Sequence, residues 1–506
     1  MKLFSIIKKL SGKNEVYIVG GWLRDALLGR PNKDLDIATA ASPAALSRKL
    51  AAAAGGTVVT LDRQNEIYRV VLNPNFASGS RNSSKNSRPL SPRFSRPNAK
   101  VGLKKPGEIA YVDICRLKGK TIGEDLVNRD FTITSIAMPL PLSAKTDFSK
   151  VIDPVGARND LKRRLVRATS DRVFTDDPLR LLRAYRMAAE LSFKIEPATL
   201  KLIKKHARLI TRAAPERIRE ELFRILATPQ AAAWIEELDS GKLLERILPE
   251  TARMKKSARK FYFHPRGLWQ HAMETLVSLE RLLGGIDKLF PGQAALLNAH
   301  LDEPLSQGIT RRTLLKITAL LHDVAKPHCA RKVGKRMRFL GHETKGARIA
   351  SAILRRLRLP GREIKIAGRL IENHMRPISL GQAPALTARA YYRFFRDLGA
   401  ESPDLVLLSL ADCASYRRLK TPVTVEFKKQ ERILKEIIAR YYEQKKEKPL
   451  PRLADGHALM KHLKIKPGPV IGKLLSAIAE AQAMGEITTK KEALALAEEK
   501  LTLLEK

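Results

Sequence analysis

The chain has 506 residues, 44% of them hydrophobic, which is long enough for several domains with cores of their own. Its 94 Lys and Arg residues against 52 Asp and Glu residues give a formal charge of +42, which favours nucleic acid as a partner and leaves an anionic membrane surface as the alternative. Three scattered cysteines exclude a disulfide framework, and no apolar run is long enough for a signal peptide or a membrane span. We therefore expect a soluble, cytoplasmic protein.

An α/β segment is predicted from about Val16 to Leu140. The runs "VYIVGG" and "YVDICRL" are rich in β-branched and aromatic residues, which is typical of strands, and the Ala-rich stretch 41–54 is typical of a helix. Residues 74–107 interrupt this segment with basic, Ser, Asn, Pro and Gly residues and no acidic one. This composition buries too little apolar surface to fold, so we expect a disordered, mobile loop, with RNA contact as the alternative.

Helices are predicted from Asp153 almost to the end of the chain. Apolar residues recur there at three- and four-residue spacing, as in "RIREELFRILA" and "TLLKITALLHDVAK". The expected fold class is multidomain α+β, with a mixed sheet and helices in the head and helices alone beyond it. The expected domains are a head (1–150), a helical neck (151–250), a third helical domain (251–440) and a helical tail (441–506).

The sequence "YIVGGWLRDALLGRPNKDLDIATA" near the start combines several features of a phosphate and metal site. Gly20 and Gly21 follow a predicted strand and open a helix, so their N–H groups are accessible to a phosphate, and Arg24 can neutralise a triphosphate oxygen. Asp34 and Asp36 are two apart on a predicted strand and share one face, roughly 6–7 Å apart at the backbone. Two such carboxylates suit a pair of Mg²⁺ ions. Together these elements favour nucleotidyl transfer.

At these residues the sequence resembles the class II tRNA nucleotidyltransferases and bacterial poly(A) polymerases of the polymerase β superfamily, over nearly the whole chain. The family motif GGxVRDxLLG followed by DxD stands here between Gly20 and Asp36. The resemblance implies a polymerase β-like nucleotidyltransferase head. It implies that Gly21 and Arg24 contact the nucleoside triphosphate and that Asp34 and Asp36 bind the catalytic Mg²⁺.

A second family motif, RRDFTxNAxA, appears as "NRDFTITSIA". The resemblance implies that Arg129 and Asp130 contact the ribose and phosphates of the incoming nucleotide. The sequence departs from the family at Asn128, which replaces the first Arg, and at Thr134-Ser135. Asp113 in "YVDI" is either a third carboxylate of the site or a member of a structural salt bridge.

A third motif lies in "FTDDPLRLLRAYRMAAEL". Arg180, Arg183 and Arg186 recur every three residues along a predicted helix that has Pro178 in its first turn. An amphipathic structural helix has the same pattern, but three guanidinium groups led by Asp177 also suit the reading of a base edge. By resemblance to the family motif EDxxR, Asp177 and Arg180 pair with the Watson–Crick edge of CTP or ATP, and Arg183 and Arg186 belong to the same nucleotide site.

A second constellation of ligand residues lies in the third domain. His322 and Asp323 are adjacent within a predicted helical run, and the order of candidate ligands is H…HD…H…H…D. Imidazole and carboxylate ligands suit Mn²⁺, Fe²⁺ or Ni²⁺. The pattern resembles the HD-domain metal-dependent phosphohydrolases, which implies phosphodiesterase or phosphatase activity for residues 251–440; an inactive RNA platform is the alternative. The six residues are His271, His322, Asp323, His342, His374 and Asp412.

These observations predict a Mg²⁺-dependent, template-independent nucleotidyltransferase that adds CMP, AMP or both from CTP and ATP to the 3′ end of tRNA. The tail resembles the ends of HD-bearing family members and is expected to meet the tRNA body through phosphates. Three alternatives stay open. The chain adds only CC, only A or a poly(A) tail; it is chiefly an HD phosphohydrolase; or it is a non-catalytic RNA-binding protein.

Overall fold

The structure is a computed structural model that describes residues 2–73, 76, 109–140, 148–257, 267–382, 386–416, 425–447 and 450–505. Apart from Phe76, the predicted insert 74–107 lies outside the described residues. The chain divides into two compact units, residues 1–213 with 241–243, and residues 214–240 with 244–506. This boundary falls inside the predicted neck, and the division into four domains stays a prediction.

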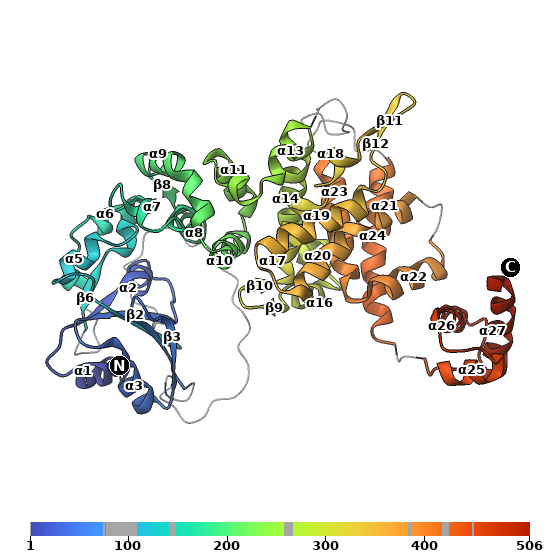
Figure 1. Cartoon of the computed structure of the whole chain (residues 1–506), viewed down its shortest axis with the longest axis horizontal. Coiled ribbons are helices and arrows are strands. Elements are labelled where there is room, and N and C mark those ends of the chain that lie inside the picture. The colour runs from blue at the N-terminus through green and yellow to red at the C-terminus, as the bar shows by residue number, and fades with distance from the viewer. Residues whose placement is uncertain are drawn as a thin grey trace. The chain divides into compact units, whose positions relative to one another are not determined.

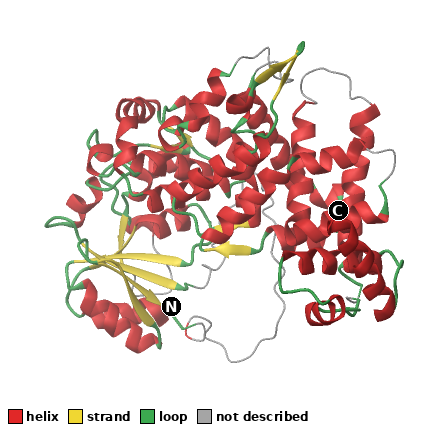
Figure 2. Ribbon diagram, turned by 45° about the vertical axis from the view of Figure 1, so that its right-hand side comes forward, coloured by secondary structure: helices red, strands yellow, loops and turns green. Residues whose placement is uncertain are grey.

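The first unit is built on a six-stranded sheet in the order β3-β4-β5-β2-β1-β6. β2 and β5 are parallel and the other neighbours are antiparallel, so the predicted mixed sheet is confirmed. Figure 2 shows these strands gathered near the N terminus. The strands are β1 (Val16–Val19), β2 (Asp34–Thr39), β3 (Thr57–Asp62), β4 (Ile67–Val71), β5 (Tyr111–Arg116) and β6 (Ala137–Pro139).

Helices α2 (Gly20–Leu27) and α3 (Pro43–Ala54) pack against this sheet, and α1 (Lys2–Ser11) packs on α3. The predicted Ala-rich helix is thus α3; the Ser42 side chain caps its start, and Gly55 ends it with a φ of 59°. The first unit continues with short helices and a two-stranded parallel pair. These elements are α5 (Ile122–Val127), α6 (Ala157–Arg163), β7 (Leu165–Val166), α7 (Val173–Asp176), α8 (Arg180–Leu191), β8 (Lys194–Ile195) and α9 (Pro197–His206).

The second unit is mainly helical, as predicted (Figure 1). Helices α14, α17, α20 and α23 pack together in it. Its helices are α10 (Pro215–Leu226), α11 (Ala231–Ser240), α12 (Leu244–Ile247), α13 (Glu250–Lys256), α14 (Leu268–Gly284), α15 (Ile286–Leu289), α16 (Ala294–Leu301), α17 (Arg311–Leu321), α18 (Lys326–Cys329), α19 (His342–Arg356), α20 (Gly361–Asn373), α21 (Met375–Gln382), α22 (Ala388–Leu398), α23 (Ser402–Ser415), α24 (Val425–Gln444), α25 (Gly456–Leu463), α26 (Pro469–Ala483) and α27 (Lys490–Glu505). None of the described helices is long and apolar enough to cross a bilayer.

The second unit also contains strands that the helical pattern did not predict. They form two small antiparallel sheets, β9 (Pro304–Ser306) with β10 (Ile309–Thr310) and β11 (Arg331–Val333) with β12 (Arg336–Arg338). Helix α17 ends at Leu321, so the adjacent His and Asp of the HD motif follow the helix and do not lie within it. In the first unit, α8 begins at Arg180 and not at Pro178, because the Asp177 side chain accepts the N–H of Leu179 at 3.0 Å and forms a turn.

Candidate functional site

The two predicted carboxylates of the head lie on β2. In the register of the sheet, Asp36 is opposite Asp113 of β5, and Asp113 is opposite Arg69 of β4. Asp113 accepts hydrogen bonds from Arg69 Nε at 2.7 Å and Nη2 at 2.8 Å, so the salt-bridge alternative for Asp113 is realised. Because side chains alternate along a strand, Asp34 shares the face of Asp36. The face therefore carries three carboxylates and one guanidinium group, Arg69, which the sequence patterns did not identify.

The glycine pair allows α2 to start directly against Asp36. A Cβ atom at Gly20 or at Gly21 would lie 3.3 Å from Asp36 Oδ2, and Gly20 has a φ of 66°, which favours glycine. The N–H of Trp22, in the first turn of α2, donates to Asp36 Oδ2 at 3.2 Å. Glycine is thus needed at both positions because a side chain there would crowd the Asp36 carboxylate against the N-terminus of α2.

The charge of Asp36 is incompletely compensated. Burial raises its pKa to about 6; the hydrogen bond from Trp22 lowers it in part, and the charge of Asp113 adds to the rise. The charges of Arg129 and Arg24 lower this pKa by less than the Trp22 hydrogen bond does. A divalent cation would supply the missing compensation, so the donor set fits a Mg²⁺ site.

Arg24 and Arg129, which the sequence places at the triphosphate, are each held by a nearby carboxylate. Arg24 donates to Asp25 through Nε and Nη2, both at 2.9 Å. Arg129 donates through Nε to Asp125 Oδ2 at 2.8 Å. Sequence reasoning missed both orienting carboxylates, although Asp25 adjoins Arg24 and Asp125 precedes Arg129 by one helical turn.

Asp130 connects the head to α8. Its Oδ2 lies 2.9 Å from Arg183 Nε, and its Oδ1 accepts the N–H of Phe131 at 2.9 Å and the hydroxyl of Thr134 at 2.8 Å. Burial alone would raise the pKa of Asp130, but the charge of Arg183, the Thr134 hydrogen bond and the charge of Arg180 lower it. Thr134, one of the departures from the family motif, thus stabilises the ionised carboxylate.

The other members of the predicted base-reading set are arranged along α8. The Arg180 guanidinium donates to the carbonyl oxygen of Val173 at 3.4 Å, and Asp177 lies one turn before the helix. Arg186 is buried and forms an ion pair with Glu190 at 2.8 Å. The structure thus brings Arg180 and Arg183 toward Asp130, whereas Arg186 is engaged within α8.

The six side chains of the HD pattern come together in the second unit, and we call them the HD group. Helix α14 carries His271 and α23 carries Asp412, whereas the other four lie at the ends of α17 and α20 and at the start of α19. None is more than 8% exposed. They form two trios whose ligand atoms lie within 4.8 Å of one another: His271, His322 and Asp412; and Asp323, His342 and His374.

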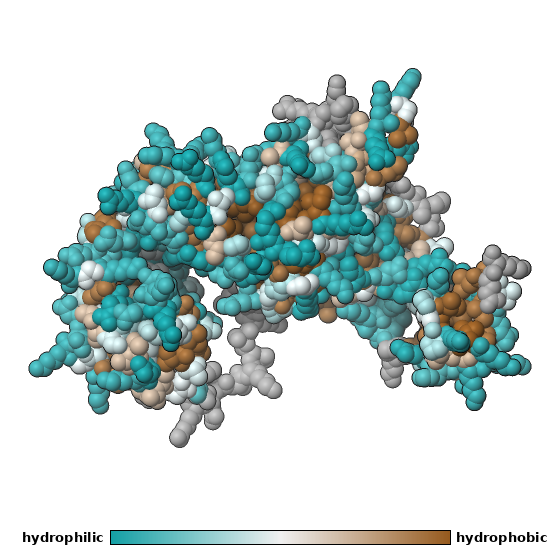
Figure 3. Space-filling model, viewed as in Figure 1, coloured by the Kyte–Doolittle hydropathy of each residue, from teal (hydrophilic) through white to brown (hydrophobic). Residues whose placement is uncertain are grey.

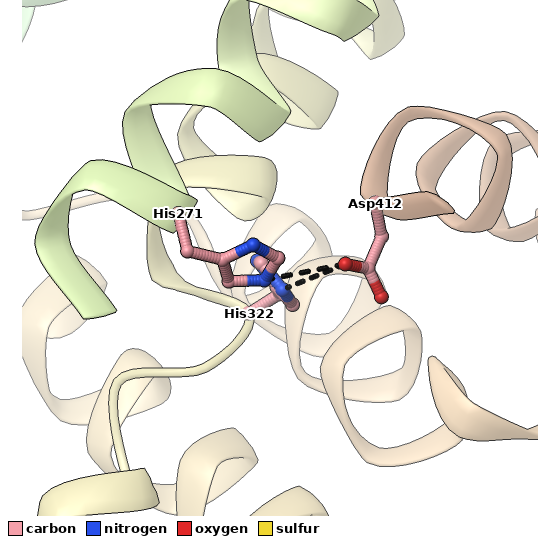
Figure 4. A group of neighbouring side chains, drawn as sticks. All are labelled: His271, His322 and Asp412. Atoms are coloured by element: carbon pink, nitrogen blue, oxygen red, sulfur yellow. Dashed lines mark ion pairs between the residues drawn. The ribbon is translucent and has the colours of Figure 1, made fainter. Parts of the chain in front are cut away.

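Asp323, a member of the second trio, also lies close to the first. Its Oδ2 is 3.3 Å from Nε2 of both His271 and His322, and its Oδ1 is 3.4 Å from His342 Nε2 and 3.6 Å from His374 Nε2. Its two oxygens would thus be available as ligands on the sides of both trios. Within the first trio, Asp412 Oδ1 lies 3.2 Å from His271 Nε2 and 4.0 Å from His322 Nε2 (Figure 4).

Hydrogen bonds fix the orientation of three of these imidazole rings. The Nδ1 atoms of His322, His342 and His374 lie 2.6 to 2.8 Å from main-chain carbonyl oxygens. Since a carbonyl oxygen only accepts, each Nδ1 carries a proton, and Nε2 of each ring faces the other ligand atoms of the group. Nε2 of His342 and Nε2 of His374 lie 3.3 Å apart.

The carboxylates of the HD group stay ionised. Burial alone would raise the pKa of Asp412, but the hydrogen bond with His271 and the charges of His271 and His322 lower it to about 2. In the same way, burial lowers the pKa of His271, but its bonds with Asp323 and Asp412 raise it to about 9. Without metal, a proton on His271 thus balances part of the negative charge of Asp323 and Asp412. A bound cation would take over this role.

Four family models match the chain. Residues 16–167 match the model described as the Poly A polymerase head domain, and residues 192–255 match the "Probable RNA and SrmB- binding site of polymerase A". Residues 268–417 match the HD domain, and residues 344–497 match tRNA nucleotidyltransferase domain 2. The mixed-sheet head and the helical HD region therefore define the class of this protein, a nucleotidyltransferase with an HD domain.

Individual relatives extend over nearly the whole chain. The A-adding tRNA nucleotidyltransferase of Deinococcus radiodurans is 32% identical over 487 residues, 94% of this chain and 93% of the relative. The CC-adding tRNA nucleotidyltransferase of Thermus thermophilus is 31% identical over 489 residues, 95% of this chain and 92% of the relative. The chain belongs to the tRNA nucleotidyltransferase family, as the sequence motifs indicated, and is an enzyme of this class. The solved complex of a CCA-adding enzyme with CTP has the same fold, with a TM-score of 0.61 and 19% identity, over 100% of this chain and 95% of that chain.

Proposed function

We propose that the enzyme adds CMP, AMP or both from CTP and ATP to the 3′ end of tRNA. Relatives of almost equal length are named A-adding and CC-adding tRNA nucleotidyltransferases, which supports tRNA as the acceptor. The observation that carries the proposal is Asp36, a carboxylate with a pKa of about 6 at the N-terminus of α2 and on the face of Asp34. We also propose a cytoplasmic location, as the sequence indicates.

In the proposed reaction, the 3′-hydroxyl oxygen of the tRNA forms a bond to the α-phosphorus of the nucleotide and the bond to pyrophosphate breaks. The hydroxyl proton leaves to solvent. Asp34 and Asp36 would hold Mg²⁺, which when bound would lower the pKa of the hydroxyl group and neutralise the charge of pyrophosphate. Gly21, Arg24 and Arg129 seat the triphosphate.

The base is read on α8 in this proposal. Asp177 and Arg180 offer an acceptor and a donor to the Watson–Crick edge. The ion pair with Asp130 holds Arg183 in place and so links α8, which reads the base, to the motif that contains Asp130. Arg186 acts through its packing within α8, because its side chain is buried against Glu190.

The decisive experiment gives the purified enzyme tRNA that ends at the discriminator base, in C or in CC, with CTP or ATP singly. Extension patterns then separate CC addition, A addition and complete CCA addition, and repeated AMP addition indicates a poly(A) polymerase. Asp34→Ala is expected to abolish transfer of every nucleotide, whereas Arg180→Ala lowers incorporation and blurs nucleotide choice. Asp62→Ala, at a half-buried position on β3, is the control. Full activity of the Asp34 variant would refute the metal assignment.

A second activity, phosphohydrolysis at the HD group, is favoured by the two complete ligand trios. We propose that this group holds Mn²⁺, Ni²⁺ or Fe²⁺ and hydrolyses phosphate esters. In such a hydrolysis, a water oxygen forms a bond to phosphorus, one P–O ester bond breaks, and the released alcohol takes a proton. The buried Nε2 atom of His322, which has no hydrogen-bond partner among the described residues, supports a resident cation.

Two variants separate the activities. His322→Ala is expected to abolish hydrolysis of 2′,3′-cyclic AMP with Mn²⁺ or Ni²⁺ and to leave nucleotidyl transfer intact, whereas Asp34→Ala has the opposite effect. If the wild-type enzyme hydrolyses neither cyclic nucleotides nor phosphorylated RNA ends with any of these metals, the HD group serves as a platform and not as a catalyst.

A further inference from the structure

A strongly basic segment separates two members of the HD group in the sequence. Between Asp323 and His342 there is no acidic residue. The centre of this segment is the antiparallel pair β11–β12, residues 331–338, which we call the basic hairpin. It projects from the second unit, and in the upper right of Figure 3 hydrophilic side chains extend from this part of the chain, with hydrophobic ones among them. The cations of the segment are Lys326, Arg331, Lys332, Lys335, Arg336 and Arg338.

The basic hairpin holds like charges next to one another. Arg331 is directly opposite Arg338 in the register, and both are exposed, as are Lys332 and Lys335. These four side chains form no ion pair with any residue that the structure describes. Like charges directly opposite each other destabilise a strand pair. The sequence therefore retains cations at a cost to the stability of the hairpin, which indicates an anionic partner.

The segments that flank the basic hairpin contact the HD group. On its C-terminal side, the carbonyl oxygen of Phe339 accepts the Nδ1 proton of His342 at 2.8 Å. On its N-terminal side, Lys326 Nζ lies 2.5 Å from Asp323 Oδ2 and 5.9 Å from the centre of the Phe339 ring. The chain thus contacts metal-ligand candidates at Lys326, before the hairpin, and at Phe339, directly after it.

More cations surround the base of the basic hairpin. Arg253 Nη1 lies 3.2 Å from Nε2 of His328, which is in the short helix before β11. Burial and the charges of Arg253 and Lys345 lower the pKa of His328. Cations therefore lie on the hairpin and also beside the segment that precedes it.

The length of the basic hairpin distinguishes a polymer from a mononucleotide. A strand of three residues spans about 10 Å, so the cations extend well beyond the phosphate of a mononucleotide held at the metal site. A chain of phosphodiesters can contact both at once. Phosphate contacts of this kind need no particular base sequence.

We propose that the basic hairpin binds the RNA backbone and presents a phosphorylated or cyclic-phosphate RNA end to the HD group. This proposal rests on the HD function proposed above and specifies its substrate: RNA ends, and not free nucleotides.

The test compares two double variants of the full-length enzyme. Arg331→Gln with Arg338→Gln removes the opposed pair of the basic hairpin. Arg281→Gln with Lys288→Gln removes the same charge from exposed positions, and Arg281 lies ten residues, about 15 Å, along α14 from His271. The substrates are a single-stranded RNA ending in a 2′,3′-cyclic phosphate and 2′,3′-cyclic AMP, both with Mn²⁺.

The hairpin variant is expected to raise KM for the RNA about ten-fold and to leave kcat and KM for cyclic AMP unchanged. The control variant leaves both substrates unchanged. The thermal stability of the hairpin variant stays at or above the wild-type value, because an opposed cation pair is lost. An unchanged KM for RNA, or an equal rise in the control variant, overturns the proposal.

Binding keeps the proposal testable if the enzyme hydrolyses neither substrate. For the same RNA with a 3′ phosphate, the slope of log Kd against log salt is expected to fall by about 1.4 in the hairpin variant, since each lost single-strand phosphate contact removes about 0.7. The control variant keeps the wild-type slope. If the slope falls in the hairpin variant but the wild-type enzyme hydrolyses neither substrate, the hairpin is an RNA-binding element and only the hydrolytic HD function is refuted. If the hairpin variant keeps the wild-type slope, the hairpin proposal itself is refuted.

Discussion

At the scale of single residues, the ionised Asp36 carboxylate suits a cation but lowers the stability of the metal-free fold. Its pKa of about 6 in the folded chain lies above the ordinary 3.8, so the ionised group opposes folding at neutral pH, and stability is gained as the pH falls from 6 toward 4. Asp36→Asn is therefore expected to raise the free energy of unfolding at pH 7 by about 1–3 kcal/mol without metal, and to abolish transfer. Denaturant unfolding in EDTA measures the free energy of unfolding of the variant and the wild type at pH 7 and pH 4. The stability gained by the variant is expected to be smaller at pH 4, where Asp36 of the wild type is protonated.

Asp113→Asn is the matched control for this prediction. The Asp113 carboxylate accepts two hydrogen bonds from Arg69, so its loss is expected to lower stability by about 1–3 kcal/mol. If Asp36→Asn destabilises the protein in the same way, Asp36 is a structural carboxylate and not a metal ligand.

The glycine pair gives a second prediction at this scale. Gly21→Ala places a Cβ atom 3.3 Å from Asp36 Oδ2 and is expected to displace this carboxylate, so that kcat falls while stability changes little. Gly20→Ala adds the strain of a φ of 66°, which is expected to cost about 1 kcal/mol of stability as well. Equal losses of stability in both variants would show that a tight turn alone requires the glycines.

Single residues were predictable where neighbours along the chain define them. The spacing of Asp34 and Asp36 and the position of the glycine pair follow from strand and helix geometry. The role of Arg69 does not, because it depends on the pairing of β4 with β5, and the intervening chain separates these strands by 39 residues in the sequence. No local pattern records such a pairing.

At the scale of elements, one ion pair links α8 to Asp130 of the head. Asp130→Asn breaks the pair with Arg183 and is expected to cost about 1–3 kcal/mol of stability and to alter the ratio of CTP to ATP use. Asp160→Asn is the control: it removes a buried carboxylate that binds Arg167 at 3.0 Å and Thr132 at 2.7 Å. Both variants lose stability, but only the Asp130 variant is expected to change nucleotide choice in single-nucleotide assays. An unchanged ratio would show that Asp130 only stabilises the fold.

Long elements were predictable and short ones were not. Apolar spacing over ten or more residues predicted α10, α17 and α19; α10 and α19 each bury one face, and α17 is buried on all sides. The basic hairpin has strands of three residues with little alternation, and the contact of Phe339 with His342 fixes its base. Likewise, no Gly or Pro marks the end of α17, where the Nδ1 bond of His322 to Ala319 orients the ring for the HD group.

At the scale of the whole molecule, the tail is a folded body with charged contacts to α22. Helices α25 to α27 share an apolar core that includes Leu459, Leu474 and Ala493. From this body, Glu480 forms ion pairs with three arginines of α22, and its side chain is only 11% exposed. The arginines are Arg389, Arg393 and Arg396. The hydrogen bond from Arg393 lowers the pKa of Glu480 most, so this contact is present at neutral pH and is lost as the pH falls through that lowered pKa.

Glu480→Gln leaves three guanidinium groups facing a neutral amide and is expected to open the contact with α22 while the apolar core of the tail persists. A loss of about 1.4 kcal/mol raises the open fraction about ten-fold, so limited proteolysis between α24 and α25 should be faster by the same factor. High salt should likewise speed this cleavage in the wild-type enzyme.

Glu486→Gln is the control. This carboxylate is 52% exposed and pairs with Arg389, so its loss is expected to change the cleavage rate less than two-fold. Equal cleavage rates in the Glu480 variant and the wild type would mean that apolar packing between α22 and α26, and not charge, holds the tail.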